Sequence, residues 1–125
     1  MPSFLYVAAG GAMGAVLRYV LGDLVTRMVG QGFPWGTLMI NILGSFLMGV
    51  VVAGWNKMPS LPPEGYLFLA VGILGGFTTF STFSLEAVQL WEQGNVAACF
   101  IYVMASVLVS ILALMGAMLW VRSVL

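Results

Sequence analysis

The sequence predicts an all-α membrane protein with four transmembrane helices, and its composition is the first reason. Of the 125 residues, 62% are hydrophobic and only 6% are charged, whereas a soluble domain carries about 25% charged residues. The second reason is that four long apolar runs occupy nearly the whole chain, and about 20 mostly apolar residues are enough for a helix to cross a bilayer. The formal net charge of zero gives no indication of a nucleic-acid partner.

The four predicted spans cover about residues 4–29, 35–55, 66–91 and 96–121, and they form a single four-helix transmembrane domain over residues 1–125. The connections at 30–34, 56–65 and 92–95 each contain glycine or proline, which interrupt helices. Trp35 and Trp55 flank the second span, at positions typical of a membrane interface. A cleaved signal peptide is disfavoured, because nothing basic precedes Arg18 and the first apolar run is too long.

The basic residues indicate no clear orientation in the membrane. With four spans, the side that holds both termini carries Lys57 and Arg122, whereas the opposite side carries Arg27. Arg18 lies inside the first span and counts weakly in the positive-inside rule. So small a bias predicts insertion in both orientations, and the two forms could then pair. A single orientation set by other features is the alternative.

Polar and small residues inside the spans recur at intervals of four, which places each set on one helix face. The rows are Thr37, Asn41 and Ser45; Tyr102, Ser106 and Ser110; and Gly10, Gly14 and Arg18, with the further glycine pair Gly72 and Gly76. Close helix packing is the interpretation favoured for the glycine pairs and for Ser106. Asn41 stays open between a structural role and contact with a permeating species, because an amide in hydrocarbon needs partners.

The third span has an unusual centre, in which glycine and hydroxyl residues replace aliphatic ones. Gly75 and Gly76 precede the run Thr78-Thr79-Phe80-Ser81-Thr82-Phe83-Ser84. Adjacent glycines weaken a helix by about 1 kcal/mol each, and Ser and Thr can bond the backbone groups that a break releases. The pattern predicts a helix broken at mid-membrane, where such backbone must be buried in protein or line a watery cavity. An ordinary packed helix with a glycine-rich face is the alternative.

Phe80 and Phe83 are three residues apart and therefore share a helix face. An aromatic pair is normally a packing feature, yet a ring also has a positive edge, which could contact an anion without any cationic side chain. The hydroxyls of Ser81 and Thr82 and the amide of Asn41 are further donors in the same region. Donors without fixed charge suit permeation, because an ion has to bind well enough to enter and weakly enough to leave.

Three segments together resemble the Fluc (CrcB-type) fluoride channels. They are residues 10–19 (GGAMGAVLRY), 36–46 (GTLMINILGSF) and 75–83 (GGFTTFSTF). The likeness covers the whole chain in length, number of spans and order of motifs, and the run Thr-Thr-Phe-Ser-Thr-Phe is highly specific.

The resemblance implies an antiparallel, dual-topology homodimer in the bacterial inner membrane, with two parallel fluoride pathways beside its central interface. It implies a passive channel that prefers fluoride to chloride, exports fluoride from the cytoplasm and so relieves fluoride toxicity. The implied pathway residues are Phe80, Phe83, Asn41, Thr37, Ser81, Thr82, Ser110, Tyr102 and Glu86, with Arg18 near the pore entrance. A structural Na⁺ at the dimer centre would be held by the backbone carbonyls of Gly75 and Thr78 from both subunits.

Two other classes of membrane protein are alternatives. A proton-coupled multidrug exporter would need a titratable carboxylate at mid-membrane, but Asp23 lies toward the end of the first span and Glu86 lies past the predicted break. A non-transporting subunit is compatible with the polar rows. An enzyme is disfavoured, because the sequence has no His and its single cysteine, Cys99, lacks a plausible base.

Overall fold

Four helical segments form the scaffold, and each is long and apolar enough to cross a membrane. The computed structural model describes residues 2–125. Helix α1 covers Ser3–Val29, α2 covers Trp35–Lys57 and α6 covers Val96–Val124, while the third spanning segment is Pro63–Glu92. The predicted all-α membrane fold is confirmed, and the predicted spans differ from these helices by only a few residues at their ends.

The third segment consists of two helical halves. The first half joins α3 (Pro63–Tyr66), the π-helix η1 (Leu67–Leu74) and α4 (Gly75–Phe77) without interruption, and α5 (Ser81–Glu92) forms the second half. Residues 78–80 between them are not helical. The predicted break of the third helix is therefore confirmed, near the middle of the segment.

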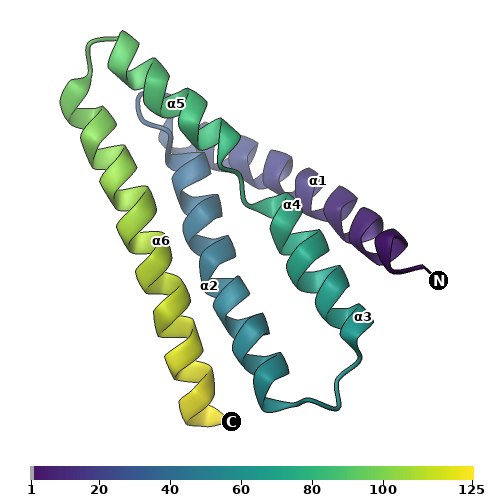
Figure 1. Ribbon diagram of the computed structural model, residues 1–125. Coiled ribbons are helices and arrows are strands. Elements are labelled where there is room, and N and C mark those ends of the chain that lie inside the picture. The colour runs from purple at the N-terminus through teal and green to yellow at the C-terminus, as the bar shows by residue number, and fades with distance from the viewer. Residues whose placement is uncertain (1) are drawn as a thin grey trace.

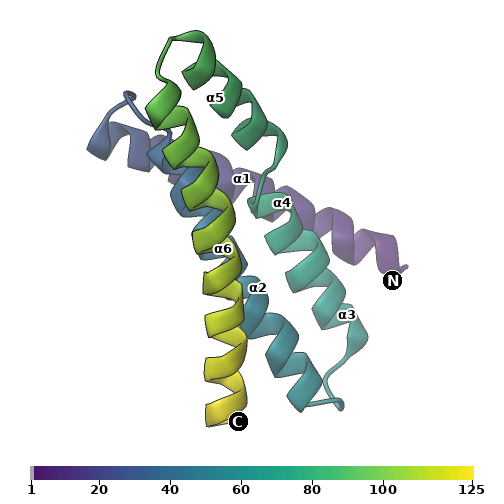
Figure 2. The same ribbon diagram turned by 60° about the vertical axis from the view of Figure 1, so that its left-hand side comes forward.

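The helices pack as two unequal pairs (Figure 1). Helices α2 and α6 lie side by side over most of their length, and their contact is the most extensive in the chain. Helix α1 crosses behind α2 and packs against η1 and α4. Figure 2 shows that α5 leaves the direction of α4 and turns toward the start of α6, against which it packs. The break thus lies where the two pairs meet.

Glycine and proline mark the ends of the helices, as the sequence predicts. Gly30 and Gly94 have φ values of 89° and 81°, which glycine adopts without steric cost. Pro34 precedes α2, and Pro63 occupies the first turn of α3. Proline is well suited to this position, because the N–H group that it lacks would have no helical partner there.

The break begins later than the glycine pair suggests. Gly75 and Gly76 keep a helical backbone within α4, and the chain becomes extended only at Thr78, with φ −78° and ψ 154°. The break thus follows the glycine pair that was expected to weaken the helix, and does not include it. The missing side chain of Gly76 serves a close contact with α1.

This contact is a glycine seam, formed by Gly10 and Gly14 of α1 against Gly72 and Gly76 of the third segment. A methyl group on Gly72 would lie 2.9 Å from the Cα atom of Gly10, and one on Gly76 would lie 2.6 Å from the carbonyl oxygen of Gly11. Only glycine allows two backbones to approach so closely. The packing interpretation of both glycine pairs is confirmed.

The outer surface of the described chain is largely apolar, as a membrane protein requires. Large exposed hydrophobic side chains occur on all the long helices, among them Phe4, Met39, Leu85 and Leu112. Within the chain, Leu38, Phe83, Leu90 and Tyr102 form a buried cluster where α2, α5 and α6 meet. So extensive an apolar exterior has to be covered by lipid or by a partner.

We expect Gly14→Ala to destabilise the protein, with Gly11→Ala as its matched control. A methyl group on Gly14 would overlap the Ile73 carbonyl, whereas one on Gly11 meets nothing within 4 Å. Overpacking typically costs about 1–3 kcal/mol. Thermal unfolding midpoints in one detergent would measure the difference. A midpoint for Gly14→Ala at or above that of Gly11→Ala would contradict the close packing of the seam.

Candidate functional site

Three aromatic rings lead from the break into the core. Phe80, in the break, is 78% exposed, whereas Phe83, in the first turn of α5, is 8% exposed. Their ring centroids are 5.5 Å apart with an interplanar angle of 54°. The Phe83 ring in turn lies 5.2 Å from the ring of Tyr102. The two phenylalanines therefore share one face, and they place one ring at the surface and the next in the interior.

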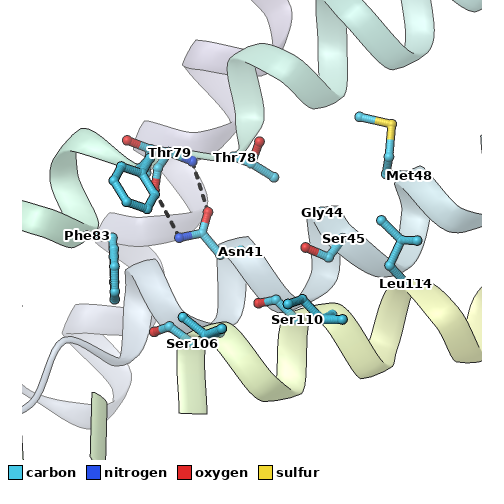
Figure 3. A pocket seen from close by; sticks show the side chains of 13 residues that line it. Asn41, Gly44, Ser45, Met48, Thr78, Thr79, Phe83, Ser106, Ser110 and Leu114 are labelled. Atoms are coloured by element: carbon cyan, nitrogen blue, oxygen red, sulfur yellow. Dashed lines mark hydrogen bonds between the residues drawn. The ribbon is translucent and has the colours of Figure 1, made fainter. Parts of the chain in front are cut away.

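A cavity of about 360 Å³ opens between α2, α6 and the break, and is called the break cavity below (Figure 3). Its lining includes Asn41, Thr78, Thr79, Phe80, Phe83, Ser106 and Ser110. The hydroxyl oxygens of Ser106 and Ser110 are buried and have no hydrogen-bond partner within residues 2–125. Because buried polar groups are normally bonded, these hydroxyls mark a place where water or an ion can bind.

Asn41 holds the broken backbone with both ends of its amide (Figure 3). Its Nδ2 donates to the Thr79 carbonyl at 3.0 Å, and the Thr79 N–H donates to its Oδ1 at 2.9 Å. The Thr82 N–H, in the first turn of α5, donates to Thr79 Oγ1 at 3.3 Å, as in a helix N-cap. Thr79 is thus held on three sides by hydrogen bonds.

A second cavity, of about 290 Å³, lies beyond Thr79 and is called the Glu86 cavity below. Its polar lining includes Arg18, Thr37, Thr82 and Glu86. Of the described residues, Thr79 alone borders both this cavity and the break cavity. Tyr102 connects the two regions, because its ring contacts Phe83 and its hydroxyl donates to Glu86 Oε1 at 3.3 Å.

Arg18 turns toward the backbone of the third segment. Its Nε donates to the Gly76 carbonyl at 3.2 Å, at the end of α4, where carbonyls lose their helical partners. A cation is also favoured there by the negative end of the helix dipole. Arg18 follows Gly10 and Gly14 on the same face of α1. The close packing of that face against the third segment therefore places Arg18 near the Gly76 carbonyl.

The structure gathers most of the predicted pathway residues into two groups. The break cavity has Asn41, Phe80, Phe83 and Ser110, and the Glu86 cavity has Arg18, Thr37, Thr82 and Glu86. Ser81 lies outside both cavities and is exposed. It differs from its neighbours because it starts α5 and is rotated away from the face that Phe80 and Phe83 share.

Sequence reasoning overlooked Thr79 and assigned Ser106 to helix packing. The signal for Ser106 was present, because it stands in the same row as Tyr102 and Ser110, and its unpartnered hydroxyl lines the break cavity. Thr79 gave a weaker signal. Its contacts are made largely by its peptide group, which no side-chain pattern reveals.

Backbone carbonyls at the break are suitable ligands for a cation. In a continuous helix, the N–H groups of Thr79 and Thr82 would bond the carbonyls of Gly75 and Thr78, four residues earlier. Here they donate to side-chain oxygens instead, which frees both carbonyls from their helical partners. Carbonyl oxygens are ligands that small, hard cations prefer. Within residues 2–125 there is no cluster of three or more His, Cys, Asp or Glu that could bind a metal.

The carboxylate of Asp23 does not stand alone in the first span. Its Oδ2 forms an ion pair with Arg27 Nε at 2.9 Å, one helical turn away, and both side chains are substantially exposed. A multidrug exporter needs an isolated carboxylate that exchanges protons within the membrane. Asp23, paired with Arg27, does not have this character.

The fold and the site define a multi-pass membrane protein with polar groups gathered around a broken helix. The sequence pattern of one family, described as CrcB-like protein, Camphor Resistance (CrcB), matches residues 5–118. The chain belongs to the CrcB-like family, in agreement with the resemblance seen in its motifs.

Several relatives are similar over nearly their whole length. The chain is 49% identical over 113 residues, 90% of each chain, to the fluoride-specific ion channel FluC of Agrobacterium fabrum. It is 46% identical over 125 residues, all of each chain, to the protein of that name from Chelativorans sp.. The one from Rhizobium meliloti is 43% identical over 123 residues, 98% of each chain. These relatives are named as ion channels and not as enzymes.

Proposed function

We propose that this protein is a passive, selective fluoride channel of the bacterial inner membrane, which exports fluoride from the cytoplasm and so relieves its toxicity. The observation that carries the proposal is the break cavity. It places two phenylalanine rings and two unpartnered serine hydroxyls around one space, with no charged side chain in its lining. The names of the relatives support fluoride as the ion.

The chemistry of the cavity suits a small anion. Fluoride holds its water tightly, so a pathway has to replace that hydration shell with other donors. Hydroxyl groups of Ser106 and Ser110 and the positive edges of the rings of Phe80 and Phe83 can supply such donors. Because none of these groups carries a charge, the ion is not held so tightly that it cannot leave.

The Glu86 cavity extends the proposed pathway toward one side of the membrane. Thr37 and Thr82 contribute hydroxyls there, and Tyr102 links it to the Phe83 ring through its bond to Glu86. Arg18 contributes a positive charge to this cavity, where the carboxylates of Glu86 and Asp23 also lie. Neutral hydrogen fluoride crosses membranes and ionises in a neutral cytosol. A passive path for the anion then lets a negative-inside potential expel it.

A second copy in the opposite orientation would complete the channel. Phe80 is 78% exposed in the single chain, although its ring is proposed to line a pathway. The small bias in the distribution of basic residues permits both orientations. In such an antiparallel dimer, with one pathway on each side of the interface, the freed carbonyls of Gly75 and Thr78 from both subunits would hold a structural Na⁺.

The dimer proposal predicts a dependence on sodium. Replacing Na⁺ by a large organic cation should weaken the dimer in detergent, measured as the mass of the protein in light scattering. Lys57, which is the single lysine, should react with an impermeant amine reagent from both faces of sealed vesicles. A dimer indifferent to sodium would remove the ion site, and labelling from one face alone would remove the dual topology.

Efflux of anions from liposomes tests the function itself. We expect purified protein to release fluoride rapidly and chloride at a far lower rate, as recorded with ion-selective electrodes. Protein-free liposomes correct for the leak of neutral hydrogen fluoride. Equal release of both ions would leave an anion pore without selectivity, and release of neither from folded protein would favour a non-transporting subunit.

The ring-edge hypothesis predicts the effect of Phe80→Ile and Phe83→Ile. Both substitutions keep an apolar side chain but remove the aromatic edge, so fluoride release should fall by roughly tenfold or more, the equivalent of about 1.4 kcal/mol. The dimer should persist in both variants. Fluoride release at the wild-type rate in both would show that the edges are not needed.

A further inference from the structure

The bonds of Asn41 point to a role that its position in the cavity alone does not suggest. We propose that Asn41 is a positioning residue, which fixes the Thr79 peptide as the partition between the break cavity and the Glu86 cavity and thereby sets the ion selectivity. This inference rests on the proposed channel function and deepens it. In this view the amide acts through the backbone, and its contact with the ion is secondary.

The side-chain amide of Asn41 already makes two hydrogen bonds to the backbone. Its oxygen accepts the Thr79 N–H at 2.9 Å, and its nitrogen donates to the Thr79 carbonyl at 3.0 Å. A primary amide has two N–H donors and one oxygen, so one donor and part of the oxygen's capacity are left over. Giving up either bond to an ion would leave a backbone group unpaired in an apolar environment, which is costly.

The Thr79 peptide, which Asn41 holds, lies at the boundary between the break cavity and the Glu86 cavity. Of the described residues, Thr79 alone borders both cavities. An ion that passes from one cavity to the other therefore has to pass Thr79. The width of that passage depends on where the Thr79 peptide lies, and Asn41 from α2 is the side chain that bonds both of its polar groups.

The hydrogen bonds between Asn41 and Thr79, called the brace below, also affect the neighbouring ring of Phe80. Phe80 follows Thr79 directly, and the next helix begins at Ser81. In its first turn the Thr82 N–H donates to Thr79 Oγ1. The position of the Phe80 ring is thus set by a residue that is bonded on three sides. If the brace is lost, both the partition and the ring can move, and the passage loses its fit to a small anion.

The experiment compares Asn41→Ala with Asn56→Ala, which removes the same side chain from an exposed position near the end of α2. Fluoride and chloride release are measured separately from liposomes that contain each dimeric variant. We expect Asn41→Ala to reduce the ratio of fluoride to chloride release about tenfold or more, and Asn56→Ala to leave it unchanged. An unchanged ratio in Asn41→Ala would overturn the proposal, whatever happens to the absolute rate.

Amide hydrogen exchange gives a readout that a general loss of stability would not produce. Exchange at the Thr79 amide should accelerate in Asn41→Ala, while amides in the middle of α2 and α6 stay as protected as in Asn56→Ala. Acceleration spread evenly over the protein would instead indicate a merely structural role and count against the proposal.

If Asn41→Ala fails to fold, amide exchange in the wild-type protein still tests the proposal. The brace predicts that Thr79 is as well protected in saturating fluoride as in its absence, because the amide does not leave the peptide for the ion. A loss of protection on adding fluoride would show that the amide transfers to the ion, and would overturn the inference. Wild type that releases no fluoride but keeps Thr79 protected would remove the channel function while leaving the brace as a structural feature.

Discussion

Inside a bilayer, each backbone N–H and C=O group needs a partner within the protein, and this requirement governs the third helix. Where that helix breaks, the N–H groups of Thr79 and Thr82 no longer reach the carbonyls four residues earlier. They donate to the side-chain oxygens of Asn41 and Thr79 instead. The Gly76 carbonyl accepts a hydrogen bond from Arg18 Nε. The break is therefore an ordered structure with its own set of bonds, supplied from two other helices.

Close packing of small residues brings those partners within reach. The glycine seam lets α1 approach η1 and α4 until backbone meets backbone. That approach aligns α1 so that its next residue on the same face, Arg18, lies at the end of α4. On the other side, Gly44 of α2 faces Phe77 and Thr78, where a methyl group would overlap the Thr78 side chain. Glycine on two helices thus makes room for the break as well as for the helices themselves.

The consequence of the break is a polar surface without net charge. Aromatic rings, hydroxyls and one amide line the break cavity. In a medium of low dielectric constant, a charged group would bind an oppositely charged ion too strongly for rapid passage. A lining of dipoles and ring edges avoids this difficulty. The single chain presents the Phe80 ring to the outside, so the proposed pathway is complete only beside a second surface.

Several elements were predictable from the sequence because their cause is local or periodic. The spans follow from hydropathy, the connections follow from glycine and proline, and the break follows from a cluster of residues that disfavour a continuous helix. The row that contains Ser106 and Ser110, and the face shared by Phe80 and Phe83, follow from helical spacing. The motifs placed the chain in its family for the same reason, since they are short and contiguous in sequence.

The position of the break and the partners of its polar groups depend on residues that are far apart in the chain, so only the tertiary structure decided them. The break lies at residues 78–80 and not at the glycine pair, and Gly76 stays helical in close contact with Gly11 of α1. The partner of Asn41 is a peptide group 38 residues away, and a backbone amide leaves no mark in a side-chain pattern. The sequence by itself determined that this is a four-span membrane protein of the CrcB-like family with a broken third helix. Only the packed structure decided which polar groups face the cavities and which hold the backbone, because hydrogen bonding depends on distance and direction in space.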